Sequence, residues 1–156
     1  RTPIGNYEAY RVDGTPADCV ALGIFNWEKV DVVLSGINLG SNLGNSIWHS
    51  GTLAAAKQAT LLGLRGIALS STVTIDEPNF DLLKPSLEEV LTLLLTENKD
   101  YSLVNVNFPD EKPKGLRWTR QSVRHYDGKI ATGDSARRSG ARCGPIKANG
   151  VKNDVK

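Results

Sequence analysis

The apolar residues of this chain gather in short continuous runs, and the segments between the runs have the spacing of amphipathic helices. The strongest runs cover residues 30–35, 66–70 and 102–108. Runs of this length, bounded by glycine and polar residues, are typical of buried β-strands. Because these strands alternate with helical segments, the pattern predicts an α/β fold with a mostly parallel sheet and flanking helices. Ligands of such folds bind beyond the carboxyl ends of the strands.

The segment before the first run has the signals of a helix start. Thr15 is suited to be the N-cap, Pro16 fits the first turn, and Asp18 supplies an acid at the third position. The helix is expected to extend to about residue 26. We expect its buried face to contain four apolar residues, Ala17, Val20, Ala21 and Ile24.

Two further helices are expected between the strands. Residues 52–62 include three consecutive alanines, which favour helix, and Gly63 follows as a left-handed stop. The next helix is expected to begin at Pro85, because Ser86 and Glu89 have the spacing of a capping box. Its apolar stripe is expected to consist of Leu87, Val90, Leu91, Leu94 and Leu95.

The pattern weakens after the third strand. Residues 116–126 could form one strand of a C-terminal β-hairpin arm, whereas residues 131–156 have little apolar periodicity. We therefore expect an α/β core over residues 1–130 and an irregular tail over residues 131–156.

Composition and charge restrict the class of protein. The chain has 156 residues, 40% of them hydrophobic, and no apolar run approaches the roughly 20 residues that span a bilayer. We expect no membrane association and a cytoplasmic location. The net charge is +2, and the tail is basic, with six Lys or Arg residues against two Asp. Because this tail lacks interleaved aromatic residues, a nucleic-acid partner is the least favoured hypothesis.

The residues most indicative of chemistry follow the first strand. Residues 35–45 are rich in glycine, asparagine and serine, and residues 50–52 form a Ser-Gly-Thr turn at the start of the next helix. A helix N-terminus offers free N–H groups and a partial positive charge, which suit a phosphate group. Neither a Gly-Lys-Ser/Thr loop nor a G-x-G-x-x-G spacing is present, so ATPase and dehydrogenase functions lose support. Ser50 could also be an ordinary helix cap.

Asn38 lies at the predicted end of the first strand. Its amide oxygen is a hard ligand of the kind that Mg²⁺ or Mn²⁺ accepts. One neutral oxygen cannot hold such an ion, so acidic partners would be needed. A structural asparagine in a turn is the alternative.

Four blocks, in the same order, resemble the family of the stationary-phase survival protein SurE. The blocks are VDGTPADCV at residues 12–20, SGIN at residues 35–38, SGT at residues 50–52 and VNVNFP at residues 104–109. The resemblance covers about residues 10–130.

The resemblance implies a Rossmann-like core and a phosphatase of nucleoside 5′- and 3′-monophosphates. It also implies a divalent metal, Mg or Mn, and a homodimer or homotetramer built partly by exchanged C-terminal arms. In the family the metal is held by an adjacent pair of Asp residues on the first strand, by a loop serine, and by the asparagine that matches Asn38. The resemblance places the phosphate-binding site at Gly40, Asn42, Ser50, Gly51 and Thr52.

The chain departs from the family pattern at both ends. The family's first strand, its Asp pair and its loop serine would lie before Arg1, so we expect the first strand to be missing and assign no catalytic residue. After residue 130 the sequence no longer resembles the family. We therefore hypothesise a metal-dependent phosphomonoesterase when the protein has its full length. The alternative is an inert fragment that binds nucleotide or phosphate, or that supports oligomerisation.

Overall fold

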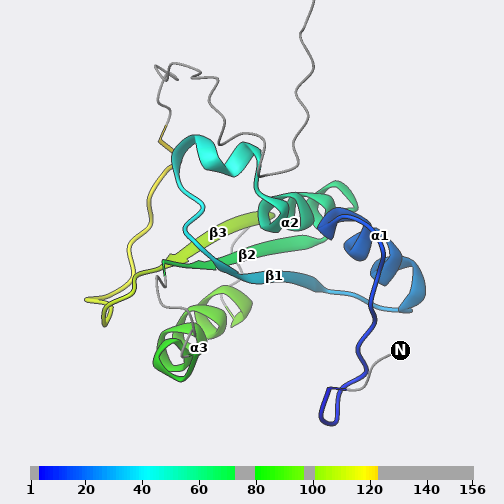
Figure 1. The fold of residues 1–156 in the computed structure, drawn as a ribbon, viewed down its shortest axis with the longest axis horizontal. Helices are drawn as coiled ribbons and strands as arrows, with labels where there is room; N and C mark the ends of the chain where they lie inside the picture. Colours follow the sequence, from blue (N-terminus) through cyan, green and yellow to red (C-terminus); the bar gives the residue numbers. More distant parts are fainter. Residues whose placement is uncertain (1–3, 73–79, 97–100, 123–156) are drawn as a thin grey trace, which may run out of the picture. The chain divides into compact units, whose positions relative to one another are not determined.

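The computed structural model describes residues 4–72, 80–96 and 101–122, which form a parallel α/β fold (Figure 1). The elements in chain order are α1 (Pro16–Asn26), β1 (Val32–Leu39), the 3₁₀ helix η1 (Gly44–Trp48), α2 (Gly51–Leu61), β2 (Arg65–Ser71), α3 (Phe80–Thr96) and β3 (Leu103–Phe108). Within these residues the strands form one sheet in the order β1-β2-β3, and both strand pairs are parallel. The predicted fold class is confirmed.

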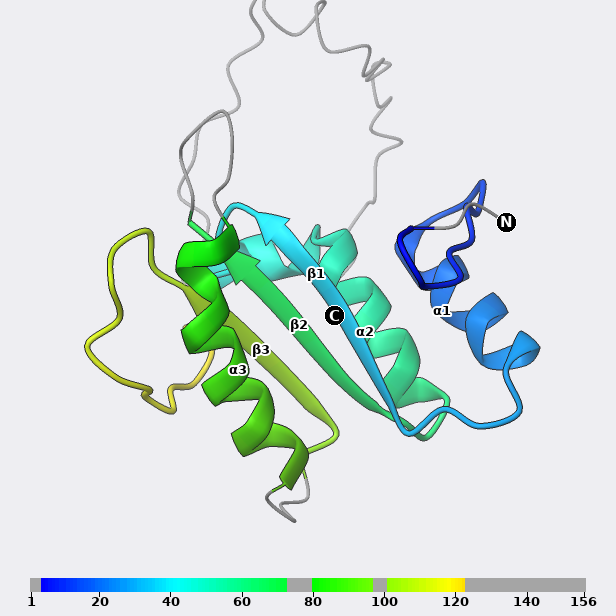
Figure 2. The same cartoon turned by 90° about the horizontal axis from the view of Figure 1, so that it is seen from below.

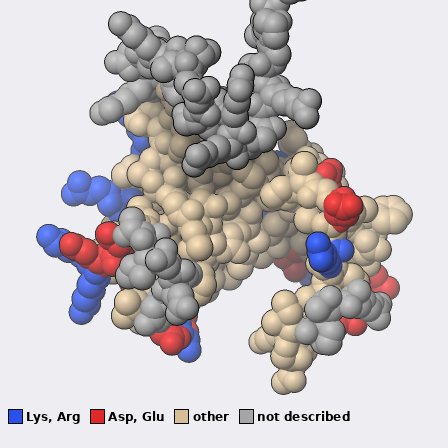
Figure 3. Space-filling model, in the orientation of Figure 1, with Lys and Arg blue, Asp and Glu red and all other residues tan. Residues whose placement is uncertain are grey.

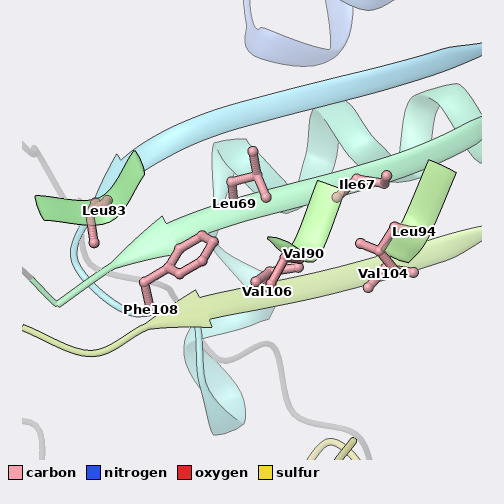
Figure 4. Packing of buried hydrophobic residues seen from close by; sticks show 8 residues of the cluster. All are labelled: Ile67, Leu69, Leu83, Val90, Leu94, Val104, Val106 and Phe108. Atoms are coloured by element: carbon pink, nitrogen blue, oxygen red, sulfur yellow. The ribbon is translucent and has the colours of Figure 1, made fainter. Parts of the chain in front are cut away.

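The two helices α2 and α3 cover opposite faces of the sheet (Figures 1 and 2). Under α3 lies the larger hydrophobic cluster, shown in Figure 4. Its buried members are Ile67, Leu69, Leu83, Val90, Leu94, Val104, Val106 and Phe108. Under α2 a smaller cluster joins Leu53, Ala56 and Ala68. Side chains alternate between the two faces along each strand. Because a helix covers each face, the side chains of β2 are buried on both sides.

The contact between α2 and β2 is close because Gly66 has no side chain. A Cβ atom at Gly66 would lie 2.0 Å from the carbonyl oxygen of Ala56. The helix itself agrees with the prediction to one residue at each end, and Gly63 follows it with a φ of 81°. The sequence between the first two strands therefore forms the expected crossover helix.

The first strand is longer than predicted. We expected residues 36–39 to begin a loop, but they continue β1, and Asn38 pairs with Ser70. The pairing register shifts between Ser35 and Asn38. Glycine is required within this irregular stretch, since Gly36 has a φ of 126° and its added Cβ would lie 2.3 Å from the Leu69 carbonyl oxygen. Glycine, which in a sequence usually indicates a loop, here allows the backbones of β1 and β2 to approach closely.

The start of α1 is as predicted. The hydroxyl of Thr15 accepts a hydrogen bond from the Asp18 N–H, and the Asp18 carboxylate accepts one from the Thr15 N–H at 2.8 Å. The prediction of its buried face is right only in part: Ala17, Val20 and Ile24 are half-buried, Ala21 is exposed, and no residue of α1 is fully buried. Within the described residues α1 packs on α2 instead of on the sheet, so its apolar residues are covered on one side only.

The start predicted for α3 is wrong. The helix begins at Phe80, and Pro85 lies inside it. Proline has no backbone N–H, so Pro85 removes one hydrogen bond from the helix, while the buried Leu83 before it packs into the core. In the predicted stripe Val90 and Leu94 are buried, whereas Leu95 is exposed.

The segment after β3 has no helix or strand within residues 109–122. The expected arm strand over residues 116–126 is therefore wrong for its described part, and residues 123–126 lie outside the described residues. The tail over residues 131–156 also lies outside them, so its irregular structure stays a prediction. None of the described helices combines the length and the hydropathy that crossing a membrane requires.

Candidate functional site

Polar side chains form a row across the carboxyl ends of the strands. Asn38 of β1 is in register with Ser70 of β2, and Ser70 is in register with Asn107 of β3. In-register residues of parallel strands point to the same face of a sheet. Ala68, two residues before Ser70, packs under α2. The row therefore lies on the face that α2 covers, at the edge where ligands of parallel sheets bind.

The loop after β1 is fixed to this row. Asn42 is 4% exposed, and its side-chain amide donates a hydrogen bond to the Ser70 hydroxyl at 2.7 Å. Its backbone N–H donates to the side-chain oxygen of Asn107 at 2.8 Å. The backbone N–H of Gly40 donates to the Ser71 carbonyl at 2.7 Å. The loop thus has a defined position, and the Asn42 side chain faces the interior instead of a ligand.

The start of α2 lies at the same edge, because a crossover helix runs antiparallel to its strands (Figure 1). The Ser50 hydroxyl accepts a hydrogen bond from the Leu53 N–H at 3.2 Å, so it acts as the N-cap. The N–H groups of Gly51 and Thr52 precede the first intrahelical bond and point out of the helix. An anion at this helix start would meet these two donors and the positive end of the helix dipole.

Asn38 is half-buried, and its side-chain NH₂ donates to the Gly40 carbonyl at 2.7 Å. This bond directs the nitrogen to the loop and leaves the side-chain oxygen for another donor or a cation. In the part of the chain that the structure describes, no three His, Cys, Asp or Glu side chains are grouped closely enough to hold a metal ion. One neutral oxygen does not retain Mg²⁺ against its hydration, so the described residues alone do not fit a divalent-metal site.

Two acidic residues that precede Asn38 in the sequence have other partners. The Asp18 carboxylate caps α1, and hydrogen bonds from the Thr15 hydroxyl and N–H lower its pKa. Asp31 is exposed and lies 3.6 Å from the Lys29 ammonium. Neither carboxylate belongs to the row at the carboxyl edge.

On the face that Figure 3 shows, Lys and Arg side chains lie away from the centre of the described surface and are mixed with Asp and Glu. Blue and red side chains lie toward the two sides of the described surface, and uncharged atoms occupy its centre.

Three residues of the site were missed by sequence reasoning. Ser70, Asn105 and Asn107 contact Asn42, but only the strand that contains each of them was predicted. The sequence did contain a signal, because Asn105 and Asn107 alternate with Val104 and Val106 and so lie on one face of the strand. Two asparagines on one face of a buried strand need hydrogen-bond partners.

The chain therefore has a parallel α/β fold with a polar carboxyl edge and a free helix N-terminus, which is the arrangement at which proteins of this class commonly bind small ligands. The family model described as "Survival protein SurE" matches residues 1–128, and the chain belongs to this family.

Curated relatives support this assignment. The chain is 42% identical over 127 residues to "5'-nucleotidase SurE 1" of Thermus thermophilus, in an alignment that covers 81% of this chain and 51% of the relative. It is 41% identical over 135 residues to "5'-nucleotidase SurE" of Deinococcus radiodurans, covering 82% and 48%. A crystal structure of the SurE protein from Aquifex aeolicus matches with a TM-score of 0.63 and 39% identity, covering 74% of this chain and 49% of that one. The chain spans about half the length of the curated relatives it matches.

Proposed function

We propose that this chain is the phosphate-binding part of a nucleotidase that hydrolyses nucleoside 5′-monophosphates. The main support is the convergence of the polar row, the fixed loop and the start of α2 on one edge of the sheet. Relatives at about 40% identity carry the name 5'-nucleotidase SurE, which gives the substrate class.

The proposed binding residues are Gly40, Asn42, Ser50, Gly51 and Thr52. The N–H groups of Gly51 and Thr52 would donate to phosphate oxygens, and the half-buried Thr52 could add its hydroxyl. Ser50 would act by capping the helix, because its hydroxyl is already bonded to the Leu53 N–H. Asn42 would act through the position of its loop, because its side chain is buried. These donors would stabilise the negative charge on the phosphoryl oxygens in the bound substrate and in the transition state.

Dependence on Mg²⁺ or Mn²⁺, activity on 3′-monophosphates and assembly into a homodimer or homotetramer are parts of the same proposal. For the metal, the Asn38 side-chain oxygen would be one ligand. The carboxylates would have to come from outside the described residues.

The test uses the protein extended to the length of its relatives. Phosphate release from a nucleoside 5′-monophosphate is measured with Mg²⁺, with Mn²⁺ and with a chelator. Asn38→Ala should lower metal-supported turnover on the order of 10–100-fold. Asn26→Ala is the matched control, because the exposed Asn26 side chain bonds only the Leu22 carbonyl at the end of α1 in the described structure. Equal turnover by the two variants would show that Asn38 does not contribute to the metal-supported reaction.

A second candidate is a module that binds phosphate without turnover. It is favoured by the lack of an acidic cluster among the described residues. Binding of a nucleoside monophosphate without phosphate release, in the extended protein and with either metal present, would establish it in place of the nucleotidase.

A further inference from the structure

Asn107 pairs with the backbone of Asn42 as a neighbouring strand would. Its side-chain oxygen accepts the Asn42 N–H at 2.8 Å, and its side-chain NH₂ donates to the Asn42 carbonyl at 3.3 Å. The NH₂ of Asn105 donates to the same carbonyl at 2.9 Å. The amide group of asparagine has the donor and acceptor of a peptide group, so it can replace a strand where none is present.

Side chains are needed here because the backbone N–H and C=O groups of β3 lie in the plane of the sheet, whereas residue 42 lies over its face. From Leu103 to Phe108 the backbone of β3 pairs with β2, residue by residue. The loop after β1 passes over the α2 face of the sheet, and Asn105 and Asn107 alternate onto this face opposite the apolar Val104 and Val106. These two asparagines are therefore the groups of β3 that can reach residue 42.

The arrangement is buried and has an energetic cost. Asn42 is 4% exposed, so its bonds are shielded from competing water. The side-chain oxygen of Asn105 is buried and has no hydrogen-bond partner in the described structure. A buried acceptor without a partner is unfavourable, and an apolar residue would avoid it. An apolar residue, however, could not donate the hydrogen bond that the Asn105 NH₂ makes to the Asn42 carbonyl.

We infer that Asn105 and Asn107 are positioning residues, which hold the loop of residues 40–43 against the sheet so that it forms one wall of the phosphate site. The inference rests on the proposed function, because only that function makes the loop part of a site. With Gly40 bonded to Ser71 and Asn42 bonded to β2 and β3, both sides of Ser41 are fixed.

The experiment compares amide hydrogen exchange and the binding of inorganic phosphate in the 156-residue chain. Asn107→Leu removes both bonds to the Asn42 backbone, so exchange of the Asn42 N–H should accelerate about tenfold or more, while that of Ile67 in β2 is unchanged. The dissociation constant for phosphate should rise roughly tenfold. Asn105→Leu leaves both Asn107 bonds in place and should have a smaller effect of the same kind.

Thr60→Val is the matched control. The Thr60 hydroxyl donates to the Ser102 carbonyl at 3.1 Å and joins α2 to the chain before β3, at the far end of the sheet. This variant should lower global stability without changing phosphate binding or Asn42 exchange, which separates positioning from general destabilisation. If Asn107→Leu does not fold, Asn105→Leu is compared with Thr60→Val instead, and the smaller effect expected of it decides.

Two results would overturn the inference. One is unchanged exchange at Asn42 in the Leu variants, and the other is a loosened loop with unchanged phosphate affinity. If the unmodified chain binds no phosphate, the proposed function fails, whereas the exchange comparison still decides whether the asparagines hold the loop.

Discussion

Replacement of Gly66 by alanine tests how closely α2 lies on the sheet. The added Cβ would lie 2.0 Å from the Ala56 carbonyl oxygen and 2.7 Å from its carbonyl carbon. An ordinary contact between carbon and oxygen is about 3.3 Å or longer, so α2 has to retreat by roughly 1 Å. The obstacle is backbone, which cannot rotate away as a side chain can.

The expected loss of stability follows from this displacement. Forcing an extra carbon into a packed core costs roughly 1–3 kcal/mol, out of a total stability of about 5–15 kcal/mol for a domain. The backbone φ of Gly66 is not positive, so the cost at this residue comes from packing. Because the N–H groups proposed to bind phosphate lie at the start of α2, phosphate affinity should fall together with stability.

Urea unfolding of two variants at each of two glycines measures the effect. At Gly66 leucine should cost clearly more than alanine, since each added carbon meets α2. At Gly63 nothing lies within 4 Å of an added Cβ, so alanine and leucine should cost similar amounts, about 1–2 kcal/mol for the left-handed backbone. If the free energy of unfolding of Gly66→Ala lies within about 0.5 kcal/mol of that of the unmodified chain, the close packing of α2 on β2 is refuted.

Four other predictions concern single features. Ser50→Ala should lower stability by about 1 kcal/mol in urea unfolding, because it removes the cap of α2, and no loss would show that the cap is dispensable. Hydrogen bonds from Thr15 lower the pKa of Asp18 in the folded protein. The contribution of this carboxylate to stability is therefore present at pH values above its unfolded pKa, and it is lost as the pH falls through its folded pKa. Asp18→Asn should therefore differ from the unmodified chain in exchange of the α1 amides at neutral pH but not in strong acid, and a constant difference would contradict this. In a double-mutant cycle of Asn42→Ala and Ser70→Ala, urea unfolding should give a coupling of about 1 kcal/mol, whereas additivity would show that their bond contributes nothing. The 156-residue chain alone should release phosphate from a nucleoside monophosphate far more slowly than the protein at the length of its relatives, and equal rates would show that the chain contains every group the reaction needs.

Local patterns predicted the second and third strands and the crossover helix well. Their apolar runs are bounded by Gly63 and polar residues, and burial of β2 on both faces agrees with its continuous apolar sequence. The same reasoning failed at a glycine and a proline, residues that usually end a strand or a helix but here lie inside one. Gly36 lies within β1 because the strand passes close to Leu69, and Pro85 lies within α3 because the preceding turn packs into the core.

The site was predicted only in part because its contacts are long-range. Asn42 meets Asn105 and Asn107, which follow it by 63 and 65 residues, and no local pattern encodes such pairs. The sequence placed Ser50 and Gly51 at a helix start correctly, since capping is a local property. It could not show that the Asn42 side chain faces Ser70, because this depends on how the loop folds back over the sheet.

A titration of the isotope-labelled chain with a nucleoside 5′-monophosphate, followed by the backbone amide resonances, locates the phosphate site directly. The resonances of Gly51 and Thr52 should shift in a saturable manner, and that of Gly63, at the opposite end of α2, should not. Shifts confined to the basic residues between 112 and 120, or no saturable shift at the start of α2, would contradict the assignment of this edge of the sheet as the phosphate site.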